Sequence, residues 1–165
     1  MKGFHANDNE RCSRFLSEND YLIICKDTDY LGTGMYFWEH KSRAQWWLKE
    51  QKKEVIVCAE IITDNMLDVT DPEIVKMLGN MFSRMDYVIR KKFNNSNISI
   101  KAGIKLDTLF ETYPKFLGIY TLVRGRRDYP IEEQDFFEGT KLSTKSVDIY
   151  SVRSPEIVIK RERVE

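Results

Sequence analysis

The feature that most constrains the fold is the run EVIVCAEI at residues 54–61. Most of its residues are apolar, several are β-branched, and charged residues lie on both sides of it. This composition favours a β-strand over a helix. A strand needs neighbours that complete its backbone hydrogen bonds, so we expect a sheet to which other segments of the chain contribute.

Other segments supply candidate strands and helices. Extended structure is expected at 3–6 (a short strand or a turn), 20–25, 34–38, 116–125, 147–152 and 156–163. Helical composition occupies 9–18, 40–52 and 107–113. A longer helix is expected after Asp71, a favourable N-cap that precedes Pro72, a favourable first helical residue. Segment 126–146 is polar with little periodicity and is predicted to be a long loop.

Short strands mixed with helices predict an α+β protein. The 165 residues suit a single domain spanning 1–165, which is long enough to bury a core without disulfides. Hydrophobic residues make up 42% and charged residues 32%, which is ordinary for a soluble globular protein.

Charge and composition narrow the function classes. Lys and Arg number 26, as do Asp and Glu, so the net charge is zero and does not by itself favour nucleic-acid or membrane binding. No apolar run approaches the ~20 residues of a membrane span, so no membrane contact is expected. Three cysteines, Cys12, Cys25 and Cys58, without a CxxC spacing indicate free thiols in a reducing cytoplasm. With only His5 and His40, a multi-histidine metal site is excluded, and no metal is expected.

The stretch LGTGMYFWEHKSRAQWW, residues 31–47, concentrates aromatic side chains beside two glycines. Gly32 and Gly34 permit a tight turn and close backbone approach, and Tyr36 follows at a fixed offset. Ser42 and Trp46 lie four apart on the expected helix, hence on one face. A tyrosine, a tryptophan and a hydroxyl around one space can sandwich a planar ring. The alternative is a hairpin packed into the core.

A second candidate residue is His5, in the segment G-F-H-A. Its apolar setting and small neighbours suit a strand edge that lines a cleft. The alternative is a structural or exposed histidine near the amino terminus.

Together, G-F-H-A, G-T-G-M-Y-F-W and the downstream K-S-R-A-Q-W resemble the ADP-ribosyltransferase superfamily, in its diphtheria-toxin and poly(ADP-ribose) polymerase branch. The match covers about 20 residues, and the order of the expected elements agrees with it for the rest of the chain. The resemblance implies a split mixed β-sheet core with flanking helices, and a histidine–tyrosine–glutamate type of triad on three strands.

The resemblance also implies an NAD site. His5 would bond a ribose hydroxyl of NAD, and the Ala6 backbone would hold the carboxamide. Tyr36 would stack on nicotinamide, Trp46 would stand in place of the family's second aromatic, and Ser42 would bond the carboxamide. Ala6 replaces the family's usual glycine, and the spacing from Tyr36 to Ser42 differs by one residue from the polymerase pattern. Gly32 and Gly34 would border the same site.

The third motif position falls on Asp148, in S-V-D-I-Y-S-V, where family members often have glutamate. A carboxylate there would stabilise the cation-like sugar of the transition state, or position and deprotonate the acceptor. Glu133 and Glu138, in the preceding loop, are competing candidates. The alternative is that Asp148 caps a strand in a catalytically inactive relative.

The resemblance implies a mono-ADP-ribosyltransferase that cleaves NAD and modifies a macromolecular acceptor, a nucleic acid or a protein. Two alternatives stay open, an NAD glycohydrolase with water as acceptor and an inactive binding module on the same fold. The resemblance and the small size also imply a cytoplasmic toxin of a toxin–antitoxin or anti-phage system, with an antitoxin protein as partner.

The predicted loop before Asp148 is a candidate acceptor-binding segment. Its basic residues bracket an acidic middle that contains two phenylalanines; they are Arg124, Arg126, Arg127, Lys141 and Lys145 around Phe136 and Phe137. Cations with exposed aromatics can hold a phosphate backbone and stack a base. The alternative is a solvated loop of mixed charge, whose acidic middle would repel nucleic acid.

Overall fold

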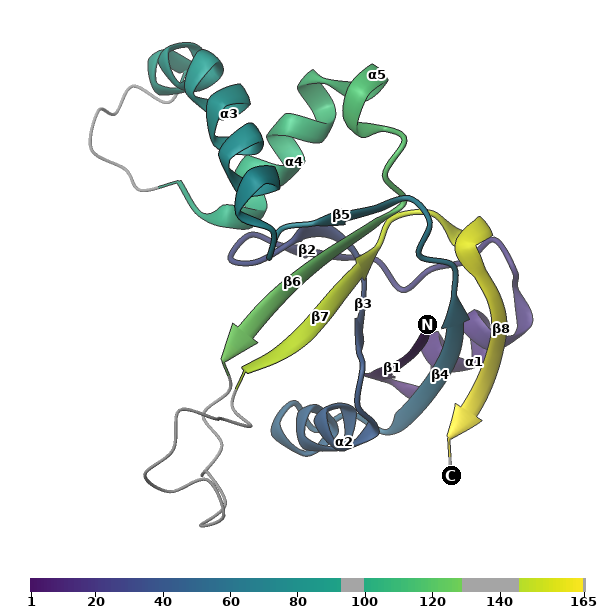
Figure 1. Cartoon of the computed structure of the whole chain (residues 1–165). Helices are drawn as coiled ribbons and strands as arrows, with labels where there is room; N and C mark the ends of the chain where they lie inside the picture. Colours follow the sequence, from purple (N-terminus) through teal and green to yellow (C-terminus); the bar gives the residue numbers. More distant parts are fainter. Residues whose placement is uncertain (93–99, 129–145, 165) are drawn as a thin grey trace.

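The computed structural model describes residues 1–92, 100–128 and 146–164, with side chains omitted for 86–92. The elements of the first half are β1 (Lys2–Asn7), α1 (Asn9–Ser17), β2 (Cys25–Asp27), β3 (Gly32–Trp38), α2 (Lys41–Glu50), β4 (Val55–Ile61), β5 (Met66–Asp68) and α3 (Pro72–Lys92). Those of the second half are α4 (Ala102–Thr112), α5 (Pro114–Leu117), β6 (Leu122–Asp128), β7 (Ser146–Val152), the 3-10 turn η2 (Pro155–Ile157) and β8 (Val158–Val164). Figure 1 shows their arrangement.

The strands form one open, mixed sheet in the order β5-β6-β7-β3-β1-β4-β8, with β2 paired to β3 off this path. The β5–β6 pair is parallel, and the other strand pairs are antiparallel. Neighbours in the sheet are therefore often far apart in sequence, as β7 and β3 are. The α+β class is confirmed, whereas the specific ADP-ribosyltransferase fold stays a prediction.

The sheet narrows between β1 and β3. These strands share a single register pair, Phe4 with Trp38, whereas β1 pairs with β4 along six residues and β3 with β7 along four. The half β5-β6-β7-β3 and the half β1-β4-β8 consequently diverge on either side of this joint (Figure 1). We call this place the β1–β3 joint.

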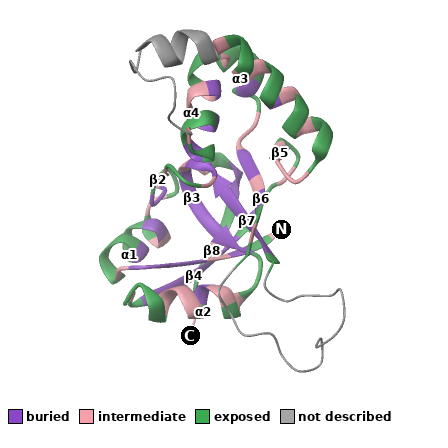
Figure 2. Cartoon of the chain, turned by 90° about the vertical axis from the view of Figure 1, so that its left-hand side faces the viewer, coloured by how far each residue is buried: buried purple, intermediate pink, exposed green. Residues whose placement is uncertain are grey.

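Alternation along β3 separates two apolar clusters. Tyr36 and Trp38 belong to the cluster that includes Ala44 of α2 and buried leucines of α3, α4 and α5. Met35 and Phe37 belong to the other cluster, which includes Phe15 of α1. Successive side chains of a strand point to opposite faces, so α2–α5 cover one face and α1 covers the other. Figure 2 shows the buried residues concentrated along the central strands.

Local chemistry explains where the long helix begins and how the helical lobe attaches. The Asp71 carboxylate accepts the Glu73 backbone N–H at 2.8 Å, which confirms Asp71 as the residue that caps α3 before Pro72. On α4, Asp107 accepts from the backbone N–H and the hydroxyl of Thr33, at 2.9 and 2.8 Å. Arg153 donates to the same carboxylate at 3.1 Å. These bonds attach α4 to the start of β3.

Two expected strands were wrong in part. Most of 20–25 lies outside regular structure, because the Ile23 N–H donates to the Met35 Sδ at 3.4 Å and the Ile24 N–H to the Leu22 carbonyl at 3.0 Å. Its apolar side chains instead fill the α1-side cluster. Segment 116–125 begins inside α5 (Pro114–Leu117), which Pro114 initiates, and becomes a strand only at β6. The three-residue strands β2 and β5 were not predicted.

Within the described ranges, no helix combines the length and the apolar character required to cross a bilayer.

Candidate functional site

Tyr36 is part of the core on the helix-covered face. Only 8% of it is exposed, its hydroxyl donates to the Gly32 carbonyl at 2.7 Å, and that hydroxyl accepts the Leu31 N–H at 3.2 Å. Burial raises the pKa of the phenol above its ordinary value. The hydroxyl thus closes the turn that leads into β3.

His5 is buried, and both of its ring nitrogens are engaged. Nδ1 lies 2.6 Å from the Tyr36 carbonyl oxygen, so Nδ1 carries the proton and donates. Nε2 lies 3.1 Å from Asn7 Nδ2 and accepts from that amide. Asn7 Oδ1 in turn accepts the Asp8 N–H at 2.9 Å, which opposes a flip of the amide. Burial is the main reason that the pKa of His5 falls from 6.5 to about 4, so the ring is neutral at neutral pH.

The side chains of His5 and Tyr36 point to opposite faces of the sheet. The His5 ring lies 5.8 Å from the ring of Phe37, on the α1-side face, and Ala6 joins Tyr36 in the helix-side cluster. His5 therefore meets Tyr36 through the Tyr36 backbone only. The expectation that the two side chains line one cleft is wrong for this arrangement, because the alternation of β1 and β3 separates them.

The two glycines make room for protein groups. Gly32 has a φ of +74°, and a Cβ there would lie 2.5 Å from Asp107 Oδ1. At Gly34 a Cβ would lie 2.9 Å from the Val152 carbonyl and would also clash with the Ser151 hydroxyl. The β3 backbone therefore lies close to the Asp107 side chain of α4 at Gly32 and close to β7 at Gly34. Both glycines lie within β3.

On α2, Ala44 is buried against the core, Ser42 is exposed and Trp46 is partly exposed. The Trp46 ring lies 6.1 Å from that of Trp47, which lies 5.5 Å from that of Trp38. The aromatic side chains therefore form a contiguous row that runs from the core to the surface. Trp46 packs against the helix-side cluster, whereas Ser42 is exposed, so their placement on one face of a ligand site stays a prediction.

Asp148 lies at the centre of an ionic network on the α1-side face. Its carboxylate accepts from Arg126 Nε at 2.8 Å and from Arg124 Nε at 3.1 Å, with a further bond from an Arg124 terminal nitrogen. Arg124 also donates to Asp68 at 2.9 Å. Burial by itself would raise the pKa of Asp148, but the two guanidinium groups outweigh it and lower that pKa. The carboxylate is ionised and already neutralised.

A polar hollow of about 330 Å³ adjoins this network. It is lined by Glu39, His40, Arg43, Arg126, Ser146, Val147 and Asp148. Neither Glu39 nor the ionic link from Arg124 to Asp68 was predicted from the sequence. The pairing of β6 with β5 and β7 brings Arg124 to Asp68 and Asp148, and the pairing of β3 with β7 brings Glu39 near Asp148, so no local motif signals them.

The strands that carry the three predicted residues are consecutive in the sheet. His5 is on β1, Tyr36 on β3 and Asp148 on β7, and the sheet order places β7, β3 and β1 side by side. In the β3–β7 ladder Tyr36 pairs with Ser151 and Trp38 pairs with Ile149. Asp148 precedes Ile149 on β7 and so lies one residue beyond the last pair of this ladder. The backbones are thus brought together, with His5 and Asp148 on one face and Tyr36 on the other.

Several predicted residues lie outside the described part of the chain. They are Glu133, Glu138, Phe136, Phe137, Lys141 and Lys145. Arg127, near the end of β6, is described, and its guanidinium carbon lies 3.9 Å from the Tyr30 ring centroid. Among the described residues, no group of three or more His, Cys, Asp or Glu side chains is arranged to hold a metal ion.

No protein-family profile, curated protein or solved structure matches the chain, so its assignment depends on the geometry and the sequence motifs described above.

Proposed function

We propose that this protein is an NAD-dependent mono-ADP-ribosyltransferase that modifies a macromolecular acceptor. The observation that supports the proposal most is the adjacency of β1, β3 and β7, which carry His5, Tyr36 and Asp148. The motif resemblance expects its three residues on three strands, and these segments are separated by up to about 140 residues of sequence. The narrow β1–β3 joint also agrees with the expected split sheet.

The proposed reaction is displacement at the anomeric carbon of the nicotinamide ribose. The bond to the nicotinamide nitrogen breaks, nicotinamide leaves with the bonding electrons, and a cation-like sugar forms. The acceptor nucleophile then bonds to that carbon, and its proton passes to a base or to water. Asp148, ionised between Arg124 and Arg126, suits electrostatic stabilisation and positioning better than proton abstraction, because its lowered pKa makes it a weak base.

A second candidate is a binding module without catalysis. It is favoured by the filled surroundings of Tyr36 and by the engagement of both His5 ring nitrogens. Catalysis through His5 requires the ring to exchange the bond from Asn7 for one to the ribose. The binding module needs no such change.

The test is incubation with NAD labelled in its ADP-ribose part, alone or with total RNA, single- or double-stranded DNA, or cell lysate. Free nicotinamide and label on each macromolecule are both measured. Asp148→Asn is the test variant, and Asp64→Asn, an exposed carboxylate, is the matched control. Label on one acceptor class that is lost only with Asp148→Asn supports the transferase.

Other results reassign the function. Nicotinamide release without label identifies an NAD glycohydrolase. NAD binding by calorimetry without release identifies a binding module, and a folded protein that neither binds nor cleaves NAD contradicts the proposal.

The proposal extends to a cytoplasmic toxin that an antitoxin protein restrains, in a toxin–antitoxin or anti-phage system. Induced expression of the wild type should then arrest bacterial growth, and Asp148→Asn should relieve the arrest. Equal growth with both proteins at equal expression contradicts the toxin role.

A further inference from the structure

Exposed apolar side chains gather on the lobe that α3, α4 and α5 form. Seven large apolar side chains are exposed in the described ranges, and four of them belong to this lobe: Val75, Ile104, Phe116 and Ile119. Phe116 is 50% exposed and Ile119, directly after α5, is 57% exposed. Single exposed apolar residues are normal, whereas several on one part of a surface are typical of a site that another molecule covers.

A groove of about 510 Å³ lies on the same lobe, and we call it the α3–α5 groove. One wall is α3, where the lining residues run from Glu73 to Arg84 at the three- and four-residue spacing of a single helix face. The other wall consists of Tyr113 and Phe116, at the corner between α4 and α5. The stretch 73–84 rises by roughly 17 Å along the helix axis, so the groove is as long as about three helical turns.

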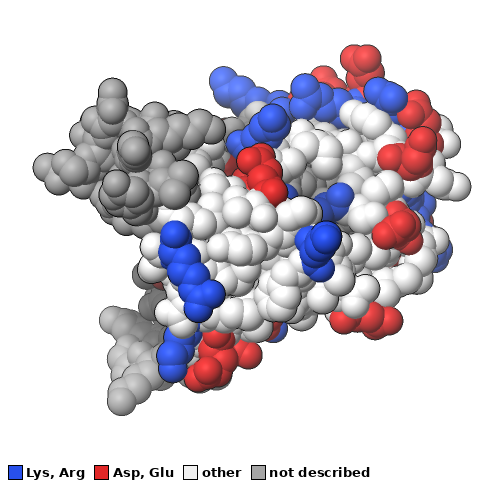
Figure 3. Space-filling model, turned by 90° about the horizontal axis from the view of Figure 1, so that it is seen from above, with Lys and Arg blue, Asp and Glu red and all other residues white. Residues whose placement is uncertain are grey.

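The floor of the α3–α5 groove is apolar and adaptable. Met77, Met81 and Tyr113 are partly buried and pack against the helix-side cluster, whereas Phe116 is half exposed. In Figure 3, which views this lobe from above, uncharged surface fills the centre of the picture between separated Lys and Arg side chains. Methionine side chains adjust to ligands of varied shape, and an apolar groove is a common receptor for an amphipathic helix.

Two cations of α3 line the groove without a counter-charge. Lys76 and Arg84 are both exposed, and no hydrogen bond or ion pair joins either of them to another described residue. Among the described lining residues Glu73 alone is a carboxylate, and it lies in the first turn of α3, where the helix dipole stabilises it. The groove therefore attracts a negatively charged ligand.

We propose that the α3–α5 groove binds an acidic amphipathic helix of a partner protein. The apolar side of that helix lies on Met77, Met81 and Phe116, and two carboxylates about two turns apart pair with Lys76 and Arg84. The groove shares no lining residue with the hollow beside Asp148. The inference thus goes beyond the proposed function and does not depend on NAD chemistry.

Other occupants fit the groove less well. A second copy docked about a two-fold axis would bring the same cationic surface against itself. A membrane requires an apolar surface that can enter the lipid, whereas Met77 and Met81 lie in a concave groove. A nucleic acid would pair with the two cations but would leave the methionines without an apolar partner.

The experiment is fluorescence anisotropy with full-length protein, without NAD, and labelled peptides of ~18 residues, which is long enough for a helix to form in water. The first peptide has leucine at helical spacing along one side and glutamate on the other sides. The second has lysine in place of glutamate, and the third is a scrambled form of the first.

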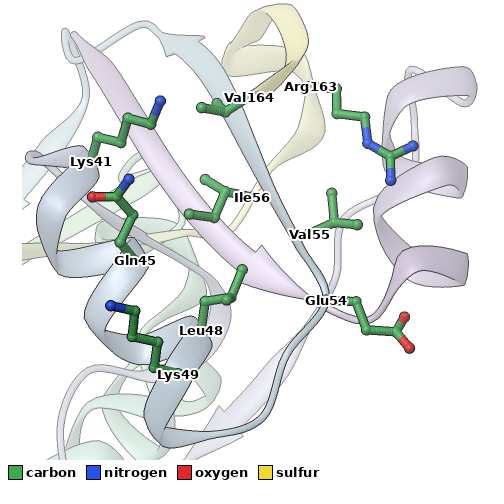
Figure 4. A pocket seen from close by; sticks show the side chains of 9 residues that line it. All are labelled: Lys41, Gln45, Leu48, Lys49, Glu54, Val55, Ile56, Arg163 and Val164. Carbon is green, nitrogen blue, oxygen red and sulfur yellow. The ribbon is translucent and has the colours of Figure 1, made fainter.

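The double variant Lys76→Glu/Arg84→Glu reverses both cations of the groove. Its matched control, Lys26→Glu/Lys49→Glu, makes the same change of charge at two exposed lysines of β2 and α2. Lys49 lines a separate hollow between α2 and the ends of β4 and β8, shown in Figure 4, so the control also reports on that hollow. Phe116→Ala removes the exposed ring, and circular dichroism confirms that every variant is folded.

The acidic peptide should bind the wild type most tightly, with an affinity that decreases as salt increases. The groove double variant should lose roughly tenfold or more and the control less than about threefold, because only the former exchanges attraction for repulsion at the contact. The groove double variant should instead prefer the lysine peptide. Phe116→Ala should cost about tenfold, because the phenyl ring covers the apolar side of the bound helix.

Equal binding of the scrambled and the patterned acidic peptide, equal losses in the two double variants, or no binding at low salt would overturn the inference. So would a dimer in sedimentation velocity that Phe116→Ala dissociates, or tighter binding to a single-stranded oligonucleotide or to phosphatidylserine vesicles than to the acidic peptide. Nicotinamide release is assayed separately, so its absence would contradict the proposed function and leave the inference about the groove intact.

Discussion

The neutral, buried state of His5 predicts a specific loss of stability in mild acid. The pKa of His5 is 6.5 when unfolded and about 4 when folded, chiefly because of burial. Between these values the unfolded chain binds a proton that the folded chain does not. Stability is therefore complete above about pH 6.5 and falls as the pH decreases toward 4.

The structure supplies the reason that protonation is costly. Nε2 lies 3.1 Å from Asn7 Nδ2, so a proton on Nε2 would face the hydrogens of that amide. The amide cannot flip without losing the bond that its oxygen accepts from the Asp8 N–H. A difference of about 2.5 pKa units corresponds to ~3 kcal/mol in full. Between about pH 7 and about pH 4.5, roughly 2–3 kcal/mol of the free energy of unfolding should be lost.

The assay is urea unfolding followed by circular dichroism across this pH range at constant ionic strength. His5→Asn keeps a donor near the position of Nδ1 but does not titrate, so its free energy of unfolding should be lower overall and nearly flat from pH 7 to 4.5. His40→Asn removes the other histidine, which is exposed, and should behave like the wild type. An equal pH-dependent loss in the wild type and His5→Asn would refute the reasoning.

Three further outcomes follow from single contacts. Gly32→Ala should destabilise the fold by ~2 kcal/mol or more in thermal or urea unfolding, because φ is +74° and the new Cβ would meet Asp107. By contrast, Gly79 on α3 has open space around it, so Gly79→Ala should stabilise the fold by ~0.5–1 kcal/mol. Arg161→Met should cost ~1–3 kcal/mol, since its guanidinium donates to four backbone carbonyls at and beyond the end of α1, and unchanged urea midpoints would contradict that role. Tyr36→Phe should cost ~1–2 kcal/mol through loss of its two hydroxyl bonds, with unfolding measured as above.

Elements with a strong local signal were predicted correctly. The apolar, β-branched run became β4, and Asp71-Pro72 begins α3 because the carboxylate caps the first turn. Segment 20–25 was wrongly predicted to be a strand because it is apolar. Its Leu22 and Ile23 side chains are buried in the core although the backbone there is irregular. An apolar run indicates that its side chains are buried, but buried side chains do not require a β-strand.

The candidate site was predictable only in its strand positions. The motif order led to His5, Tyr36 and Asp148, and the structure places their strands side by side. Side chains alternate between the two faces of a sheet along each strand, so the face on which a given side chain lies depends on the strand register. That register has no local sequence signature. The partners of Asp148 likewise come from β6, whose pairing with β7 is a tertiary property.

The β1–β3 joint has a mechanical consequence. One ladder pair, Phe4 with Trp38, and one side-chain bond, from His5 to the Tyr36 carbonyl, connect the two halves of the sheet along this line. Each such bond contributes only ~1 kcal/mol net, so hinge-like twisting here is opposed mainly by the packing of the flanking side chains. The bond from His5 Nδ1 to the Tyr36 carbonyl therefore joins the two half-sheets at the place where the backbone ladder is shortest.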